Sequence, residues 1–230
     1  MTASEQTGAR DRPTGRGPRW LTVLVAAGAL VAAALLGGAV GLLLAPSPKD
    51  ASAEPNPVDV GFAQDMTVHH QQAVTLASWA RDHSDDPAIR RLAGDIEIGQ
   101  SDQIGRMQGW LGLWSYPARA AGPPMTWMAG HDHRRHPTEP GRPMPGMATV
   151  DEIDRLRTLS GPDLDVYFLQ LMIRHHQGGG PMMGAAIDGA AVGEVRNLAA
   201  QMLAAQSAEI TTMTTMLTDR GARPFTPPGR

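Results

Sequence analysis

Cysteine is absent from all 230 residues of the chain, and aromatic side chains make up only 4% of it. The absence of thiols excludes a cysteine nucleophile. It also fits a compartment outside the cytoplasm, where a free thiol is oxidised or trapped as a disulfide. The chain does hold 8 histidines and 13 methionines, whose imidazole and thioether groups still bind soft metal ions under those conditions.

Several catalytic and binding motifs are missing as well. The sequence contains no Gly-x-Ser-x-Gly and no His-Glu-x-x-His, so two common hydrolase sites are excluded. Glu-x-x-His is also absent, which excludes the ligand set of the di-iron helical bundles. The formal net charge of −3 leaves no basic patch of the kind that nucleic acids require. We therefore expect a binding protein that is not an enzyme and has no nucleic-acid partner.

A long uncharged segment, residues 21–45, follows an N-terminal tail that contains four arginines. At about 1.5 Å per residue, a helix of this length crosses a hydrocarbon core of roughly 30 Å. We predict a single transmembrane anchor over 21–45, with the arginine-containing tail, 1–20, in the cytoplasm and the C-terminal domain outside. Cleavage at 51–53, Ala-Ser-Ala, would instead make the segment a signal peptide and the protein secreted. Residues 46–57 form a Pro-rich linker.

The chain contains the pattern Phe-x-x-x-Met-x-x-His-His-Gln twice, at 62–71 and 168–177, with an offset of 106 residues. The same offset aligns further positions, such as Gln100 with Gln206. Apolar residues recur at helical spacing in both copies. We predict an all-α domain over 58–220, in which two duplicated helical hairpins make a four-helix bundle.

Capping signals and helix breakers set the expected boundaries. Asp86 and Pro87 form an N-cap and a first-turn proline, and Thr149 with Glu152 resembles a capping box. Three glycines and a proline at 178–181 interrupt the third long helix, because proline removes a backbone donor. We therefore expect one short helix and four long ones, at 58–83, about 87–116, about 149–159, about 163–189 and about 195–217.

Both histidine pairs fall on lines of apolar residues. On a helix, Met66 lies on the same side as His69 and His70, which follow it by three and four positions. His69 continues the core spacing of the first copy, and His175 does so in the second. A histidine buried in this way must be paired, hydrogen-bonded or bound to a metal.

Two interpretations of these histidines are open. Each could bond a glutamine on a matching apolar face, Gln100 or Gln206. The duplication and the softness of the donors favour a copper ion. Because both pairs lie near mid-helix, we expect one shared site, with the second half dominant through its additional methionines. The candidate ligands are Met66, His69, His70, Met172, His175, His176, Met182 and Met183.

The connection between the hairpins, residues 117–149, is long and has little helical pattern. It is either a further group of metal ligands or a solvated crossover, and the sequence leaves both open. Its three histidines are counted among the candidate metal ligands. The soft donors in it are Met125, Met128, His131, His133, His136, Met144 and Met147.

The repeated motif, the downstream Leu-Ala pairs and the Pro145-Gly146-Met147 segment resemble the bacterial family called domain of unknown function 305. The resemblance covers about 58–217. It implies a ferritin-like four-helix bundle, exported or membrane-anchored, in a family associated with copper binding and tolerance. The chain departs from the family pattern at Leu76, where the family has methionine, and at Gln103, where it often has glutamate. The second half keeps both, as Met182 and Glu209.

We therefore expect a single-pass membrane protein whose external domain buffers or chaperones copper, or confers tolerance to it. The expected partners are the metal ion and the membrane, with a second copy of the chain or a membrane complex left open. Two alternatives from other classes remain. One is a structural or interaction subunit of a membrane complex, and the other is a copper-dependent oxidase.

Overall fold

The computed structural model describes residues 53–128 and 144–225. These ranges hold five α-helices and one short 3-10 helix and contain no strand, which confirms the all-α prediction. The predicted tail, the predicted anchor and most of the linker lie outside the described residues. None of the helices in the described ranges is long and apolar enough to cross a membrane. The elements are α2 (Pro57–His83), α3 (Pro87–Leu113), η1 (Thr126–Met128), α4 (Val150–Thr158), α5 (Gly161–Gly189) and α6 (Gly193–Asp219).

The capping signals act as predicted at two helix starts. The Asp86 carboxylate accepts the Ala88 N–H at the start of α3, and Thr149 and Glu152 form a reciprocal capping box at the start of α4. The second long helix ends earlier than predicted, at Leu113. Ser115 adopts a left-handed backbone conformation with φ of 61°, which ends the helical run.

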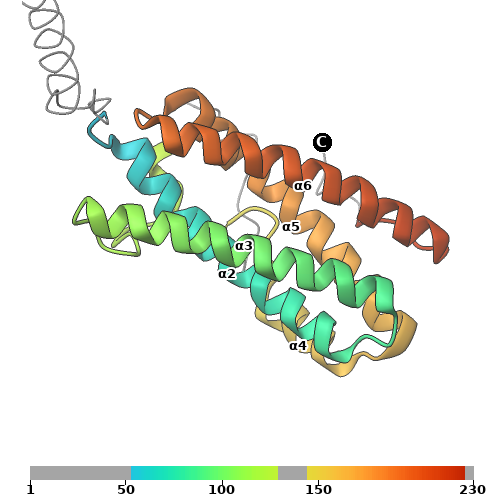
Figure 1. The fold of residues 1–230 in the computed structure, drawn as a ribbon. Helices are drawn as coiled ribbons and strands as arrows, with labels where there is room; N and C mark the ends of the chain where they lie inside the picture. Colours follow the sequence, from blue (N-terminus) through green and yellow to red (C-terminus); the bar gives the residue numbers. More distant parts are fainter. Residues whose placement is uncertain (1–52, 129–143, 226–230) are drawn as a thin grey trace, which may run out of the picture. The chain divides into compact units, whose positions relative to one another are not determined.

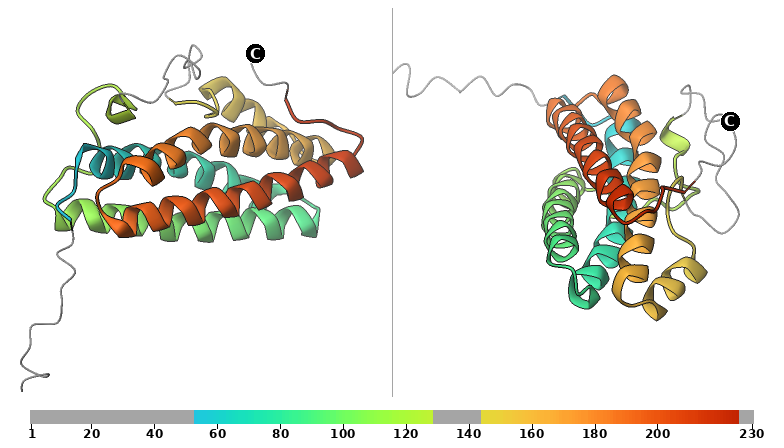
Figure 2. Two further views of the ribbon diagram at one scale, coloured as in Figure 1. Left: turned by 90° about the horizontal axis from the view of Figure 1, so that it is seen from above. Right: turned by 90° about the vertical axis from the view of Figure 1, so that its right-hand side faces the viewer.

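The four long helices form two hairpins, α2 with α3 and α5 with α6, which meet through α2 and α5. These two central helices run antiparallel. At one end, the Ala191 N–H donates to the Asp59 carboxylate over 2.9 Å, and at the other the Ser84 hydroxyl donates to Asp165 over 2.6 Å. Figures 1 and 2 show α3 and α6 on one side of the central pair, and α4 with η1 on the other. The middles of α2 and α5 therefore lie at the same level.

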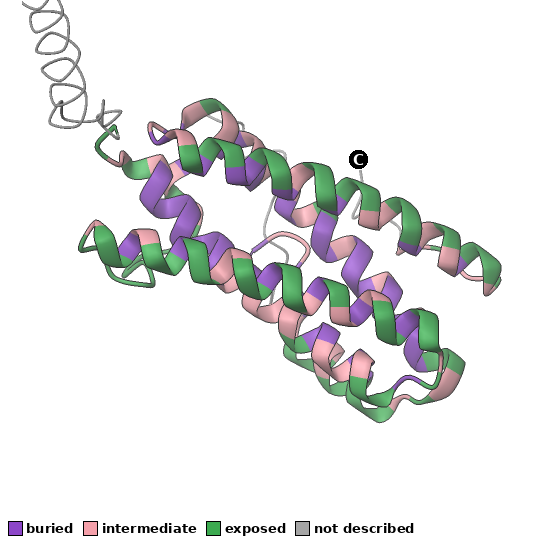
Figure 3. Cartoon of the chain, viewed as in Figure 1, coloured by how far each residue is buried: buried purple, intermediate pink, exposed green. Residues whose placement is uncertain are grey.

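Buried residues concentrate on α2 and α5, as Figure 3 shows. They form two apolar clusters. The second cluster surrounds Phe168 and Leu76. The first surrounds Phe62 and is rich in methionine from the long helices and from both ends of the crossover: Met66, Met107, Met128, Met144, Met147, Met182, Met183 and Met202. Met128, Met144 and Met147 of the crossover thus fill the core, and the partly buried Met125 packs against it.

The crossover begins by packing against α2. The Asp65 carboxylate accepts the Met125 N–H over 2.6 Å and the Trp127 indole N–H over 2.8 Å. The Trp127 ring covers Gly61, where an added Cβ would lie 2.2 Å from the ring. Burial raises the pKa of Asp65, which its two hydrogen bonds oppose. The first part of the crossover is therefore fixed to α2.

The predicted interruption of the third long helix at 178–181 is wrong, because α5 continues through Pro181. Gly180 has no Cβ to clash with the following proline ring, which removes one of the usual obstacles. Gly178 serves a different purpose. A Cβ there would lie 2.1 Å from the Pro145 carbonyl oxygen, so the returning crossover rests directly on this glycine. Gly178 thus allows a close approach of loop and helix.

Candidate metal centre

His69 and His175 meet in the middle of the domain, where α2 and α5 cross. Their ring centroids are 3.9 Å apart and the rings are tilted by 39°. His70 lies 6.4 Å from His69, and His176 lies 6.3 Å from His175. Each of the four residues is at most 1% exposed. The structure thus brings both repeated pairs into one buried group of imidazoles.

Three of these imidazoles bond a hydrogen-bond acceptor through Nε2. His69 faces the Pro145 carbonyl over 3.2 Å, and His70 faces the Gln103 side-chain oxygen over 2.7 Å. His176 faces the Glu209 carboxylate over 2.5 Å. Because each partner is an oxygen acceptor, Nε2 carries the proton in the neutral ring and Nδ1 keeps its lone pair.

The Nδ1 atoms of all four histidines are buried and have no hydrogen-bond partner. In His175, neither ring nitrogen has a hydrogen-bond partner. Buried polar atoms are normally satisfied, and each one left unpaired costs free energy. The group therefore presents unused lone pairs in a place where water does not reach them.

Burial also keeps the rings of His69, His70 and His175 neutral. Desolvation lowers the pKa of His69 to about 4 and that of His70 to about 3, with the charge of His69 adding to the effect on His70. It lowers the pKa of His175 well below the ordinary value, and the charges of the neighbouring histidines act in the same direction, whereas the backbone of His69 opposes it. A neutral imidazole with a free lone pair is the form that binds a metal ion.

Around Gly179, a methionine and a glutamine approach the histidines. A Cβ on Gly179 would lie 3.3 Å from His69 Cε1, 3.4 Å from Gln206 Oε1 and 3.5 Å from Met183 Cε. Met66 and Met182 pack in the same apolar cluster as Met183. Met172 packs in the other cluster, one helical turn before His175 on α5.

The proposed bonding of the histidines to Gln100 and Gln206 is wrong. Both side-chain amides are buried, and neither their nitrogen nor their oxygen has a partner. The glutamine that does bond a histidine is Gln103. Gln206 lies beside His69 at Gly179, although the sequence indicated it only as a hydrogen-bond partner of a histidine. Its alignment with Gln100 at the repeat offset was the signal that could have pointed to a place near the histidines.

Within the described ranges, no three His, Cys, Asp or Glu side chains are arranged to hold one ion. The donors gathered around His69 and His175 are imidazoles, with the Met183 thioether beside Gly179. The predicted crossover ligands His131, His133 and His136 lie outside the described residues.

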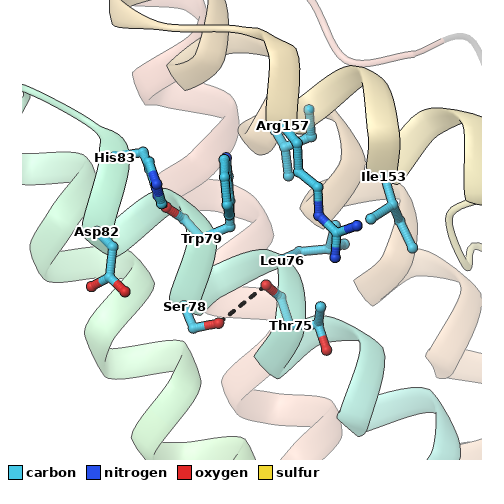
Figure 4. Close-up of a pocket in the computed structure, with 9 residues that line it drawn as sticks. Thr75, Leu76, Ser78, Trp79, Asp82, His83, Ile153 and Arg157 are labelled. Carbon is cyan, nitrogen blue, oxygen red and sulfur yellow. Dashed lines mark hydrogen bonds between the residues drawn. The ribbon is translucent and has the colours of Figure 1, made fainter.

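A cavity of about 280 Å³ lies between α2 and α4 (Figure 4), and none of the four histidines lines it. The Trp79 and His83 rings stack in its wall, with centroids 3.6 Å apart. Its two hydroxyl groups are already engaged, since Ser78 donates to the Thr75 carbonyl and Thr75 donates to the Gln71 carbonyl. Arg157 also pairs with Asp154 across one helical turn. We assign this cavity no function.

A family model, described as a domain of unknown function (DUF305), matches residues 59–217. The chain belongs to the DUF305 family. A DUF305 protein of Streptomyces coelicolor, provisionally described as secreted, is 44% identical in a comparison that covers 74% of this chain and 97% of that one, with a TM-score of 0.67. A DUF305 fragment from Deinococcus radiodurans is 36% identical, covers 72% and 98%, and has a TM-score of 0.59.

CopM, whose structures include Cu(I)-bound and Cu(II)-bound forms, is also similar to this DUF305 chain. The Cu(I)-bound form is 25% identical over 70% of this chain and 96% of CopM, with a TM-score of 0.54. The Cu(II)-bound form is 26% identical, with a TM-score of 0.53. An uncharacterised protein of Acanthamoeba polyphaga mimivirus is 36% identical over 53 residues. That match spans 23% of this chain and 35% of the length of the viral protein.

Proposed function

We propose that the domain binds copper between α2 and α5, at a site centred on His69 and His175. The observation that carries the proposal is the group of buried imidazoles whose Nδ1 atoms have no partner. When bound, the ion would supply the missing partner for these lone pairs. His70 and His176 lie 6.4 Å and 6.3 Å from these two rings and would join the nitrogen ligands by turning toward the ion, because no three of these side chains hold one ion as they stand. Met183, which approaches Gly179 beside His69, would supply a thioether.

The donor set favours copper over other metals. Imidazole binds zinc, iron and copper alike, whereas thioether sulfur selects soft ions such as copper(I). The described residues offer no carboxylate-rich cluster for a hard ion. The copper-bound structures of CopM support the choice, because that protein shares the helical fold of the domain.

We infer that the protein buffers or delivers copper, or confers tolerance to it, and does not turn over a substrate. The histidines are fully buried, which suits the storage of an ion away from oxidants and competing ligands. Residues 21–45 would tether the domain outside the cytoplasm, or be removed to release it. The provisional description of the Streptomyces coelicolor relative as secreted supports an extracytoplasmic location.

Metal analysis after competitive loading tests the proposal. The full chain in detergent is exposed to copper, zinc and iron together, and the bound metal is measured after gel filtration. Copper retention that is lost in His69→Ala/His175→Ala is the expected result. His131→Ala/His133→Ala/His136→Ala is the matched control, which leaves the core methionines of the crossover intact.

Three results would contradict the proposal. Copper lost only in the crossover variant would move the site to residues 129–143. Retention of no metal, with normal binding to a membrane partner, would favour a structural subunit. Steady turnover of an oxidisable substrate by the copper-loaded protein would favour the oxidase.

A further inference from the structure

The two repeats differ in the side chain that accepts a hydrogen bond from the second histidine of each pair. We call these second histidines, His70 and His176, the outer histidines. The repeat offset aligns His70 with His176 and Gln103 with Glu209. In the first half, α3 presents the neutral Gln103 side-chain oxygen to His70 Nε2 over 2.7 Å. In the second half, α6 presents the Glu209 carboxylate to His176 Nε2 over 2.5 Å. The duplicated site therefore has one amide and one carboxylate at equivalent places.

The carboxylate reaches the site from a partly solvated position. The Glu209 side chain is 31% exposed, whereas the His176 side chain is 0% exposed. Glu209 thus accepts a hydrogen bond from a buried ring while part of its side chain meets solvent. Hydrogen bonds to an ionised acceptor are shorter and stronger than those to a neutral one.

An acceptor at Nε2 has a consequence for the other ring nitrogen. It fixes the proton on Nε2, orients the ring and raises the electron density available at Nδ1 for a metal ion. A carboxylate does this more strongly than an amide oxygen. His176 Nδ1 is buried and unpartnered, so it is the atom on which the effect would act.

We propose that Glu209 is a positioning residue that makes His176 the stronger outer copper ligand, and that Gln103 leaves His70 the weaker one. The inference rests on the proposed copper site and adds the residue that makes its two halves unequal. Met182 and Met183 are not needed for this inequality, because it arises from the acceptors on α3 and α6. Exchanging the two acceptors should therefore reverse it.

Copper(I) affinity of the full chain, measured by competition with a chromophoric copper(I) chelator, tests the exchange. We expect Glu209→Leu to weaken binding by about 10- to 100-fold, as is typical for the partner of a ligating histidine. Glu209→Gln keeps an acceptor and should weaken binding less. Gln103→Glu should strengthen it. Glu194→Gln removes an acid from the exposed start of the same helix and should change nothing.

The reciprocal variant Gln103→Glu/Glu209→Gln is the decisive comparison. Its affinity should return toward that of the unsubstituted chain, but its dependence on the histidines should reverse. His176→Ala should cost more affinity in the original background, and His70→Ala should cost more in the exchanged one. A purely structural contact between α5 and α6 would not produce this reversal.

The metal-free protein offers a readout that is independent of affinity. Long-range 1H–15N NMR spectra should show His176 as the Nε2–H tautomer in the original chain and in Glu209→Gln, but not in Glu209→Leu. Unchanged copper affinity in both Glu209 variants would overturn this inference alone and leave the copper site standing. Failure of the unsubstituted chain to bind copper would overturn both.

Discussion

The rings of His69 and His175 lie in contact at 3.9 Å, although 106 positions separate them in the chain. The contact follows from the antiparallel pairing of α2 and α5, which brings the middle of one helix against the middle of the other. The repeat thus gives each copy half of a common centre. Neither hairpin alone holds both rings.

This contact predicts that the two central histidines act as a unit in copper binding. His69→Ala and His175→Ala should each remove most of the affinity, and the double variant should be little worse than either. Residues that share one site are not additive. Calorimetric titration of the three variants with copper measures this. Fully additive losses would instead indicate two independent ions.

His175 should weaken the fold in the absence of metal. Both of its ring nitrogens are buried without a partner, and such a group costs roughly 1–3 kcal/mol each time it is left unpaired. We expect His175→Leu to raise the free energy of unfolding of the metal-free protein, as measured in urea. His176→Leu is the contrast, because it breaks the bond to Glu209 and should not stabilise. A destabilised His175→Leu variant would contradict the prediction.

The sequence predicted much of the fold, because the duplication and the caps at Asp86 and Thr149 are local signals. It also predicted that the histidine pairs lie at one level, since each lies mid-helix. It did not predict the continuity of α5, because three glycines and a proline at 178–181 are typical of a helix break. It did not predict the packing of Gly178 either, because that contact is with a loop more than thirty positions earlier. The acceptors for the histidines were missed for the same reason. Pro145, Gln103 and Glu209 come from three separate elements.

We expect that Gly178 tolerates no side chain, whereas Gly184 of the same helix tolerates one. A Cβ at Gly178 would lie 2.1 Å from the Pro145 oxygen, the group that His69 bonds. Gly178→Ala should therefore destabilise the domain and weaken copper binding. An alanine at Gly184 meets nothing within 4 Å and should stabilise the helix by roughly 1 kcal/mol. Thermal unfolding of both variants measures the difference, and equal effects would contradict it.

The segment 21–45 should keep the full chain in the membrane. Its length and lack of charge fit a bilayer span, and four arginines precede it. We expect the expressed protein to resist carbonate extraction and to retain its N-terminal tail, as shown by mass spectrometry. A soluble product beginning at Glu54 would instead show cleavage after Ala53.

The metal-free domain should lose stability as the pH falls below neutral. The pKa of His69 is lowered to about 4 and that of His70 to about 3 in the folded chain, whereas an unfolded histidine titrates near its ordinary value of 6.5. Above that value both states are neutral and stability does not depend on these groups. Between pH 6.5 and 4 the unfolded chain binds protons that the folded chain cannot, so the free energy of unfolding falls.

Each such histidine contributes about 1.4 kcal/mol per pH unit once it is fully titrating in the unfolded chain. His175, whose pKa is also lowered by burial, adds to the same slope. Urea unfolding at pH 7.5 and pH 5.5 should therefore differ by a few kcal/mol, and His175→Leu should reduce the difference by one histidine's share. Equal stability at the two pH values would mean that the imidazoles take up protons without leaving the core.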